Sequence, residues 1–598
     1  MRRLGVYGEN LPTKKERTVQ PADFSIAGLV GFFDRKYNRC FTVRSDIEAQ
    51  AIFGQQSNRN SYGWDCLNGF FANLKGEFGS IVVNSPAGDG AVQASKTFAD
   101  GDSNDRLTVK GAYMGEDEYG VWANRTGVKI TQGAFFKTVL TGTHTASTAT
   151  VAVESVAGLH VGDVVKIHDT SASTPDADIL STVVTISESD NTLVLASTFS
   201  ITHDSDKYTL EGMGFQIRTF RKSETGLISE VDKTLGQIWC TLNANDPDHY
   251  APQVFQQSSF VKIQALTVVS SVSLPVSTDI VFLEGGTTGT LPSTVLAWQE
   301  VYKKFDSLPI RLVANCETSV DTIQKALEAY CNSREDNPIA VLVPKYGVET
   351  KSGMITMGNF FQRSDEVDAV LVGNWIGVPD PFSTSPLAPD REIPAVGHIM
   401  GLWICSMTRY GIHSSPARKT LGLVGINSVV GYTAEVDQDR TELAEAGVNV
   451  IQKIAGRGFV LRNSFTPSTV AEFRYANAVL QRNFIKISCI DALQDSENTP
   501  NTIAYVREDR MAVLQFMYRL WRSGSNGNTR EGEFFGQYEK EDGSLSTVEE
   551  AFEVIADASN NSVASLQAGE RNIDIWFMFP APAGSIKVGV GLIYKTVA

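Results

Sequence analysis

The chain has 598 residues, 42% of them hydrophobic, with 52 lysines and arginines against 68 aspartates and glutamates, so its formal net charge is −16. A chain of this length can bury a sizeable core and is expected to divide into several domains. The acidic balance and the lack of a basic run exclude broad nucleic-acid binding. No apolar run approaches the ~18 residues of a membrane helix or resembles a signal peptide, so we expect a soluble protein made in the cytosol.

Short strands and helices alternate in the first part of the chain. Ser45, with Glu48 three residues later, forms a capping box that predicts a helix ending near Gly54. Residues 85–106 are rich in Gly, Asp and Ser, which predicts a loop. The other predicted elements are strands over Phe24–Val30, Cys40–Val43 and Ser80–Asn84 and a helix over Phe70–Leu74.

Between about residues 135 and 212 the composition shifts to Ser, Thr, Val and Asp. Short apolar runs recur there between turn signals, a spacing typical of a small all-β domain. Gly127–Ile130 before this segment and Gly214–Arg218 after it have the pattern of neighbouring strands in one parent sheet. We therefore interpret residues 135–212 as an insertion, which is tolerated where its two ends lie close together at the surface.

From Val295 the pattern alternates between helix and apolar strand. Ile339–Val343 is a nearly continuous apolar strand closed by Pro344, as expected for a parallel sheet covered on both faces. The other predicted elements are strands over Ile310–Ala314 and Val367–Val372, and helices over Val295–Phe305, around Ile323–Tyr330, up to Gly447, over Ser468–Ile485 and over Val506–Arg522.

Residues 573–598 predict two strands. Ile573–Phe579 alternates between two faces, and after a Pro- and Gly-rich break five apolar side chains share one face: Ile586, Val588, Val590, Leu592 and Tyr594. An unpaired strand edge is a liability unless another strand covers it. At the other end, Leu4, Val6 and Leu11 lie in a short extended arm. We predict that both ends pair with another copy of the chain by strand addition.

No catalytic constellation is recognisable. The sequence lacks a G-x-x-x-x-G-K-[ST] phosphate loop, an H-E-x-x-H motif and a G-x-S-x-G motif. The seven histidines never pair at i+3 or i+4, which argues against a metal site. The seven cysteines are scattered without a C-x-x-C pair, so we expect reduced structural thiols. We therefore expect no catalytic residue, no cofactor-binding residue, no metal ligand and no cofactor.

Short motifs nevertheless follow one another in a specific order over roughly three quarters of the chain. They are Gly5–Glu9, Ser25–Gly31, Phe53–Gly54, Trp122–Asn124, Leu283–Gly289, Asn374–Pro381, Ile393–Gly401, Tyr410–Ala417, Leu443–Ile451 and Phe552–Asn561. Together they resemble the motifs of contractile phage tail sheath proteins. The chain departs from the family pattern at Leu4, where proline is usual, and at Arg418, where asparagine is usual. The resemblance does not cover residues 135–212 or much of 55–110.

The resemblance implies a mixed α/β, multidomain fold. It consists of a sheath-type C-terminal α/β domain, a central α/β domain, terminal strand-exchange arms and the inserted small all-β domain. The predicted ranges are 1–20 for the N-terminal arm, 21–134 and 213–390 for the central domain, 135–212 for the insertion on the exterior, 391–583 for the C-terminal domain and 584–598 for the C-terminal arm.

The resemblance also implies a structural role, not an enzymatic one. Such subunits form stacked, hexameric rings around a tail tube, within a virion tail assembled in the bacterial cytoplasm. They contract from a metastable extended lattice to drive the tube through the host envelope. The expected partners are the chain itself, the tube protein, and the baseplate and tail terminator or neck proteins, with no nucleic acid and no membrane insertion. The expected strand-exchange residues are Leu4, Val6, Tyr7, Leu11, Ile586, Val588, Val590, Leu592 and Tyr594. Basic residues that could face an acidic tube are Arg507, Arg510, Arg519 and Arg522.

Three alternatives stay open at this stage. The sheath of a phage-like injection system or bacteriocin would share the fold. A virion-associated enzyme would need a carboxylate- or histidine-based site, which the sequence does not offer. A host-adhesion role could attach to residues 135–212, whose strands are rich in Ser and Thr.

Overall fold

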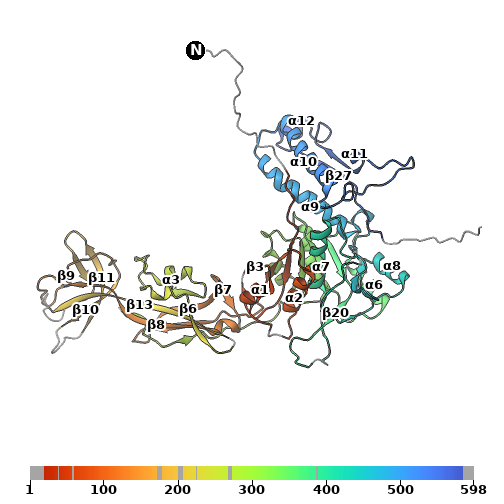
Figure 1. The fold of residues 1–598 in the computed structure, drawn as a ribbon. Helices are drawn as coiled ribbons and strands as arrows, with labels where there is room; N and C mark the ends of the chain where they lie inside the picture. Colours follow the sequence, from red (N-terminus) through yellow and green to blue (C-terminus); the bar gives the residue numbers. More distant parts are fainter. Residues whose placement is uncertain are drawn as a thin grey trace, which may run out of the picture.

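The computed structural model describes residues 19–583 except 38, 57–58, 171–177, 199–206, 224, 267–272, 386–387 and 419. Figure 1 shows a body built around a central sheet and an arm of β-strands that projects from it. The body holds the N-terminal strands together with most of the C-terminal half of the chain, and the arm holds the segment between them. None of the described helices is long and apolar enough to cross a membrane.

A seven-stranded sheet organises the body. Its neighbouring strands are parallel except for the pair at one edge, β3 and β4. Its inner strands are apolar at nearly every position and buried on both faces, which is the pattern of a covered parallel sheet. In spatial order the strands are β23 (Val448–Asn449), β19 (Ala369–Val372), β18 (Ile339–Leu342), β17 (Leu312–Asn315), β1 (Ile26–Val30), β4 (Ser80–Asn84) and β3 (Cys40–Val43).

Helices cover both faces of this sheet, and each face has its own hydrophobic cluster. One face is covered by α4 (Val295–Lys303), α5 (Asp321–Ser333), α6 (Lys351–Phe361) and α8 (Asp437–Glu445). The other face is covered by α1 (Asp46–Phe53), α2 (Gly63–Leu74), α7 (Val396–Tyr410), α9 (Ala476–Leu493) and α10 (Ile503–Ser523). The capping box predicted at Ser45 is confirmed in part, because the Ser45 hydroxyl accepts from the Glu48 backbone N–H, whereas the Glu48 carboxylate accepts from the N–H of Arg44.

The core of the body does not divide where a domain boundary is predicted. β23 lies beyond residue 390 yet pairs with β19, and α7 packs against α2 from the first part of the chain. The predicted boundary between residues 390 and 391 therefore runs through one sheet and one hydrophobic cluster. The reason is that a parallel sheet recruits strands that are far apart in sequence, which a linear division cannot represent.

The base of the arm contains a five-stranded sheet with its own core. Its strands are β2 (Lys36–Tyr37), β5 (Ser95–Ala99), β6 (Asp105–Tyr113), β7 (Glu116–Tyr119) and β15 (Val261–Ala265). The loop predicted over residues 85–106 is wrong at 95–99 and 105–106, where β5 pairs with β6. In β5 only Phe98 is buried, and the polar residues around it give no apolar alternation from which a strand could be predicted.

Two long strands connect the base of the arm to its tip. β8 (Thr126–Val139) and β13 (Tyr208–Lys222) pair antiparallel along almost their whole length, so Gly127–Ile130 and Gly214–Arg218 are neighbours in one sheet as predicted. Their far ends carry the predicted insertion, which has a hydrophobic cluster drawn from residues 135–210. The further strands of the insertion are β9 (Thr150–Ala152), β10 (Val164–Asp169), β11 (Ile179–Ser187) and β12 (Thr192–Leu195). Near the base of the arm, β14 (Ile228–Val231) pairs with β13, and β16 (Val281–Phe282) pairs with β8.

The first two of the remaining elements lie in the arm, and the others complete the body. They are η1 (Val121–Arg125), α3 (Ala251–Val254), β20 (Trp375–Val378), β21 (Arg391–Pro394), β22 (Ser428–Val430), β24 (Ile451–Ile454), β25 (Gly458–Leu461), α11 (Val548–Ala551), β26 (Phe552–Ile555), α12 (Val563–Gln567) and β27 (Asp574–Phe577). The helix predicted over 468–485 begins only at Ala476, because residues 464–475 fold back on themselves through a Phe465–Tyr475 bridge. The helix predicted over 506–522 is confirmed as α10, which ends at Gly524. Together these elements confirm a mixed α/β fold.

Lys36 gives the fold a measurable pH dependence. Its ammonium is fully buried against the Phe32 ring with no hydrogen-bond partner among the described residues, and burial lowers its pKa to about 6, opposed by the charge of Glu317. At Lys36 the unfolded chain therefore binds more protons than the folded chain between pH 6 and the ordinary lysine pKa of 10.5, so the contribution of this residue to stability rises with pH across that window.

Between pH 7 and pH 9 we expect the free energy of unfolding of the wild type to gain up to about 2–3 kcal/mol relative to that of Lys36→Met, and we expect the variant to be the more stable protein at pH 7. Urea unfolding at several pH values measures both effects. Lys303→Met, at an exposed lysine, is the matched control and should leave the slope unchanged. The same dependence of stability on pH in the wild type and in Lys36→Met would contradict the prediction.

Candidate assembly surface

The C-terminal part of the body ends in a two-stranded sheet with open edges. β26 and β27 pair antiparallel, with Phe552 opposite Phe577, and neither pairs with any other strand among the described residues. One face packs on the body through Phe535, whose ring lies 5.3 Å from that of Phe552 and 5.9 Å from that of Phe577. Because an isolated two-stranded sheet is marginally stable, this one depends on that packing. No described strand covers its two edges, and Arg510 of α10 donates to the Val554 oxygen on β26.

The strand predicted over Ile573–Phe579 is confirmed as β27. Ile575 and Phe577 are half-buried, whereas Asp574 and Trp576 are exposed, as the alternation predicts. The structure describes the chain up to residue 583, so the apolar face from Ile586 to Tyr594 lies outside the described residues. The same holds for Leu4, Val6, Tyr7 and Leu11 in the N-terminal arm. Their role in strand exchange therefore stays a prediction.

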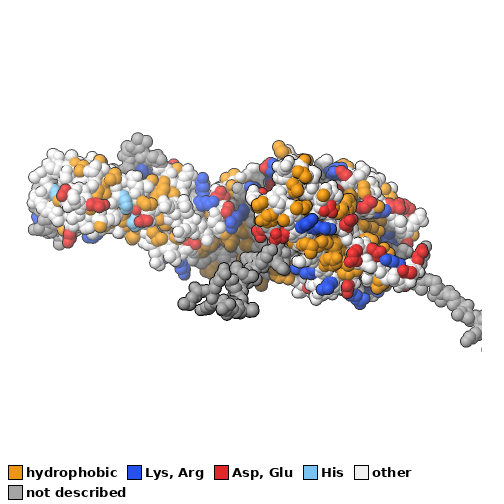
Figure 2. Space-filling view, turned by 90° about the horizontal axis from the view of Figure 1, so that it is seen from above, with side chains coloured by type: hydrophobic (Ala, Val, Ile, Leu, Met, Phe, Trp, Pro, Cys, Tyr) orange, Lys and Arg blue, Asp and Glu red, His pale blue; other side chains and the backbone are white. Residues whose placement is uncertain are grey.

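Large hydrophobic side chains are exposed on the elements around β27. Trp576 on β27 is 66% exposed, Val563 on α12 73% and Met511 on α10 53%. Figure 2, which looks down on these C-terminal elements, shows hydrophobic side chains gathered on the surface of the body. The exposed set in this part of the chain is Ile503, Met511, Tyr518, Tyr538, Leu545, Val563 and Trp576. Exposed apolar groups at this density are typical of a surface that binds another protein.

The structure separates the four arginines predicted to face the tube. Arg510 donates from Nε to the backbone oxygen of Val554 at 3.0 Å, and Arg519 donates to the backbone oxygen of Val19 and lies over the Phe516 ring. Arg507 and Arg522 are exposed, but they lie about 22 Å apart along α10 at 1.5 Å per residue. The four side chains therefore do not form one patch, and two of them bind backbone oxygens of their own chain.

Glycines in the Ile393–Gly401 motif let two helices touch. A Cβ atom at Gly397 would lie 2.1 Å from the backbone oxygen of Cys66, and one at Gly401 would lie 2.2 Å from that of Phe70. α7 therefore packs on α2 with its backbone close to that of α2, and it is buried from Val396 to Met407. This motif therefore supports the core.

Other motifs are joined by hydrogen bonds across the sequence. The Asn124 side chain donates to the Gly286 oxygen at 3.1 Å and accepts from the Gly286 N–H at 2.9 Å, which connects two motifs in the arm base. Asn374 accepts from the Ile451 N–H at 2.9 Å, and Asn449 donates to the Leu371 oxygen at 3.0 Å. Asn374 and Asn449 are buried and Asn124 is half-buried, and all three satisfy backbone groups of distant segments. These motifs therefore help to define the fold.

One polar cluster was not predicted from the sequence. His160, Asp163 and Asp246 each offer an atom within 4.8 Å of the other two, at the junction between the base and the tip of the arm. The signal present in the sequence was the close spacing of His160 and Asp163, but Asp246 comes from a distant segment. No local pattern could have brought the third residue into the cluster.

The seven cysteines are free thiols, and only Cys40 is not fully buried.

Comparisons with known proteins add a likeness to contractile assemblies. No family model and no curated protein sequence matches this chain. Similar solved structures include the anti-feeding prophage baseplate, 17% identical with a TM-score of 0.40, covering 52% of this chain and 78% of that one. The contracted sheath complex of an extracellular contractile injection system is 16% identical with a TM-score of 0.39, covering 51% and 77%. The contracted helical sheath of the anti-feeding prophage is 18% identical with a TM-score of 0.38, covering 48% and 74%. The TM-scores of these three matches are all 0.40 or lower.

Proposed function

We propose that this chain is the sheath subunit of a contractile tail, which polymerises around a tail tube. The observation that carries the proposal is the two-stranded β26–β27 sheet, whose edges are open among the described residues. It lies a few residues before the alternating segment that begins at Ile586. Sheath-like motifs such as Ile393–Gly401 support the same assignment, because they lie in the core that also holds Phe552 and Val554 of this sheet.

Strand addition would connect the subunits of the proposed sheath. An added strand would extend the β26–β27 sheet through backbone hydrogen bonds, and its apolar side chains would supply the buried face. The expected donors are the N-terminal arm with Leu4, Val6, Tyr7 and Leu11, and the C-terminal arm with Ile586, Val588, Val590, Leu592 and Tyr594. Such a mesh keeps neighbouring subunits connected while they move past one another.

The work of contraction would come from the lattice itself. Each square ångström of apolar surface buried between subunits contributes about 25 cal/mol, so a contracted lattice with larger contacts is favoured without a nucleotide. Exposed groups such as Val563, Trp576 and Leu545 supply apolar surface for these contacts.

The proposed partners are other copies in stacked hexameric rings, the tube protein, and baseplate and terminator or neck proteins. The proposed site of action is the virion tail, which drives the tube through the host envelope. Phage tail and phage-like injection system remain alternatives that genomic neighbours would separate.

Self-association tests the proposal directly. Sedimentation velocity of the full chain over a range of concentrations should show large polymers that grow with concentration. A 65.1 kDa species at every concentration and salt condition, also in the presence of a co-expressed tube protein, would contradict it.

The two exposed arginines of α10 give a separate test of tube contact. We expect Arg507→Glu with Arg522→Glu to reduce co-sedimentation with an acidic tube protein at least tenfold, because two attractive contacts become repulsive. Thermal unfolding should be unchanged, since neither side chain is buried. Lys222→Glu, at an exposed lysine at the end of β13, is the matched control. Unchanged co-sedimentation of the double variant would show that these arginines of α10 do not contribute to binding of the tube.

A further inference from the structure

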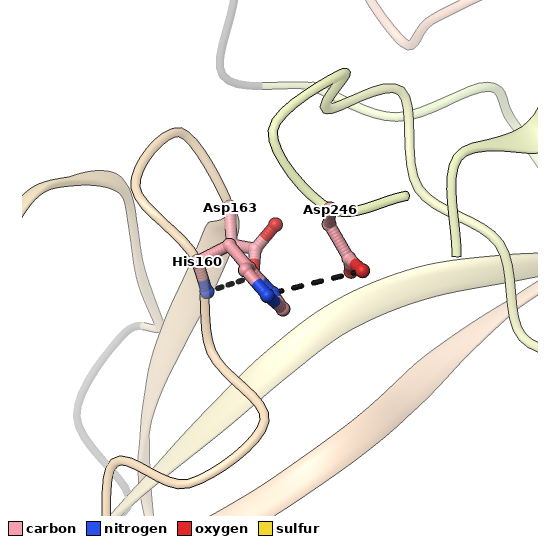
Figure 3. A group of neighbouring side chains, drawn as sticks. All are labelled: His160, Asp163 and Asp246. Carbon is pink, nitrogen blue, oxygen red and sulfur yellow. Dashed lines mark hydrogen bonds and ion pairs between the residues drawn. The ribbon is translucent and has the colours of Figure 1, made fainter. Parts of the chain in front are cut away.

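Two buried carboxylates face each other at the junction of the arm base and the arm tip. Asp163 lies in the turn that leads into β10, and Asp246 lies in the loop that precedes α3. Both residues are fully buried. Figure 3 shows His160 and Asp163 on one loop and Asp246 on the facing loop, with the His160 ring turned toward Asp246. The two loops belong to different hydrophobic clusters, since Leu159 packs in the tip and Ala251 in the base.

The charge of these carboxylates is not balanced by a lysine or an arginine of the described residues. Asp163 accepts from the His160 N–H at 2.7 Å and from the Asn243 side-chain amide at 2.8 Å. Asp246 accepts from His249 Nδ1 at 2.9 Å. Two buried like charges are costly unless a cation lies between them.

The hydrogen bonds hold both carboxylates in fixed orientations. The Asn243 amide positions one oxygen of Asp163, and the His249 ring, which packs 5.1 Å from the Phe135 ring, positions Asp246. Ligating carboxylates in metal sites are oriented by partners of this kind. The loops can approach because residue 162 is a glycine with φ of +99°, where a Cβ atom would lie 2.8 Å from Asn243 Oδ1.

His160 supplies a nitrogen ligand in the same place. Its Nδ1 is shielded from solvent, has no hydrogen-bond partner within the described part of the chain and lies 3.6 Å from Asp246 Oδ1. Ligand atoms at ~2.0–2.2 Å from a common ion lie roughly 3–4 Å from each other, so this separation fits a shared metal. The His160 ring is partly exposed, with 39% of the side chain accessible, which leaves an entry path for the ion and for a water ligand.

We propose that His160, Asp163 and Asp246 bind a divalent transition-metal ion, Zn²⁺ or Mn²⁺, that fixes the tip of the arm to its base. One imidazole and two carboxylates suit these ions. Ca²⁺ prefers six to eight oxygen ligands, and this cluster offers too few. The ion balances the two carboxylates and connects residues 160–163 to the loop at 246. It thereby adds a connection between two parts of the chain that the β8–β13 ribbon and loop contacts also join.

Isothermal titration of the full chain with Zn²⁺ or Mn²⁺, after treatment with a chelator, tests the proposal. We expect one saturable site, and at least tenfold weaker binding for Asp246→Asn and for His160→Gln. Co²⁺ serves as a spectroscopic probe, because its visible absorption reports nitrogen and oxygen ligands directly and should be lost in His160→Gln. The matched control is His168→Gln, which removes a histidine that contacts Asp178 at 2.7 Å in the same sheet without a third ligand.

Two outcomes would overturn the site. One is the absence of saturable binding by either metal, and the other is binding that both substitutions leave unchanged. If Asp246→Asn unfolds because it removes a buried hydrogen-bond acceptor, His160→Gln decides, since its side chain is partly exposed. Circular dichroism of each variant before titration establishes that the fold is retained. Polymer formation is a separate readout, so failure of the metal site would leave the proposed sheath function standing.

Discussion

Removal of residues 584–598 should convert polymers into monomers or isolated rings. The segment carries the alternating face from Ile586 to Tyr594, and the β26–β27 sheet that would accept such a strand has open edges among the described residues. Without an added strand, the unpaired backbone groups of that sheet stay in water and the connection between subunits is lost. Electron microscopy and sedimentation of the truncated chain measure the effect, and polymers as long as those of the full chain would contradict it.

Point substitutions separate strand addition from a general effect of truncation. Val590→Pro removes a backbone N–H that a paired strand would donate, and it should weaken assembly nearly as much as the deletion does. Val588→Asn with Leu592→Asn keeps the backbone but makes the apolar face polar, and should also weaken assembly. Ser585→Ala with Lys587→Gln alters the opposite face and is the matched control. Equal loss of assembly in the control would argue against an alternating strand.

Substitution of both Gly397 and Gly401 by alanine should cause the largest loss of stability. The new Cβ atoms would lie 2.1 Å and 2.2 Å from backbone oxygens of α2, and a backbone cannot rotate away as a side chain can. Because α7 is buried in the main core, the helices must move apart and leave gaps. At about 1–3 kcal/mol for each overpacked position, the pair is expected to cost several kcal/mol.

Urea unfolding measures this loss, and a shift of the midpoint to much lower urea is the expected result. Gly101→Ala is the matched control, because a Cβ atom there would meet nothing within 4 Å and its backbone is not in the left-handed region. An unchanged midpoint for the Gly397/Gly401 variant would show that α7 and α2 can separate without cost.

Much of the body could be predicted from local patterns. The apolar runs that became β18 and β19 and the helical face of α10 are signals within a single element. β5 and the start of α9 were not predicted correctly, for a shared physical reason. β5 is held by its pairing with β6, and the start of α9 is set by a bridge between Phe465 and Tyr475. Tertiary contacts decide both, and local propensity does not contain them.

The functional residues were predictable to a smaller extent. The alternation of β27 could be recognised from the sequence, because period-2 exposure is a property of the strand itself. The basic residues of α10 looked like one group, but Arg510 and Arg519 bind backbone oxygens that the sequence did not identify. The His160 cluster depends on a loop contact with Asp246, and the sequence alone does not show which distant loops lie next to each other.

Negative-stain electron microscopy of the purified, overexpressed full chain tests the sheath assignment most directly. The account predicts long, hollow, cross-striated tubes, formed by the chain alone or around a co-expressed tube protein. Discrete monomers or dimers under all salt conditions, with and without the tube protein, would contradict it.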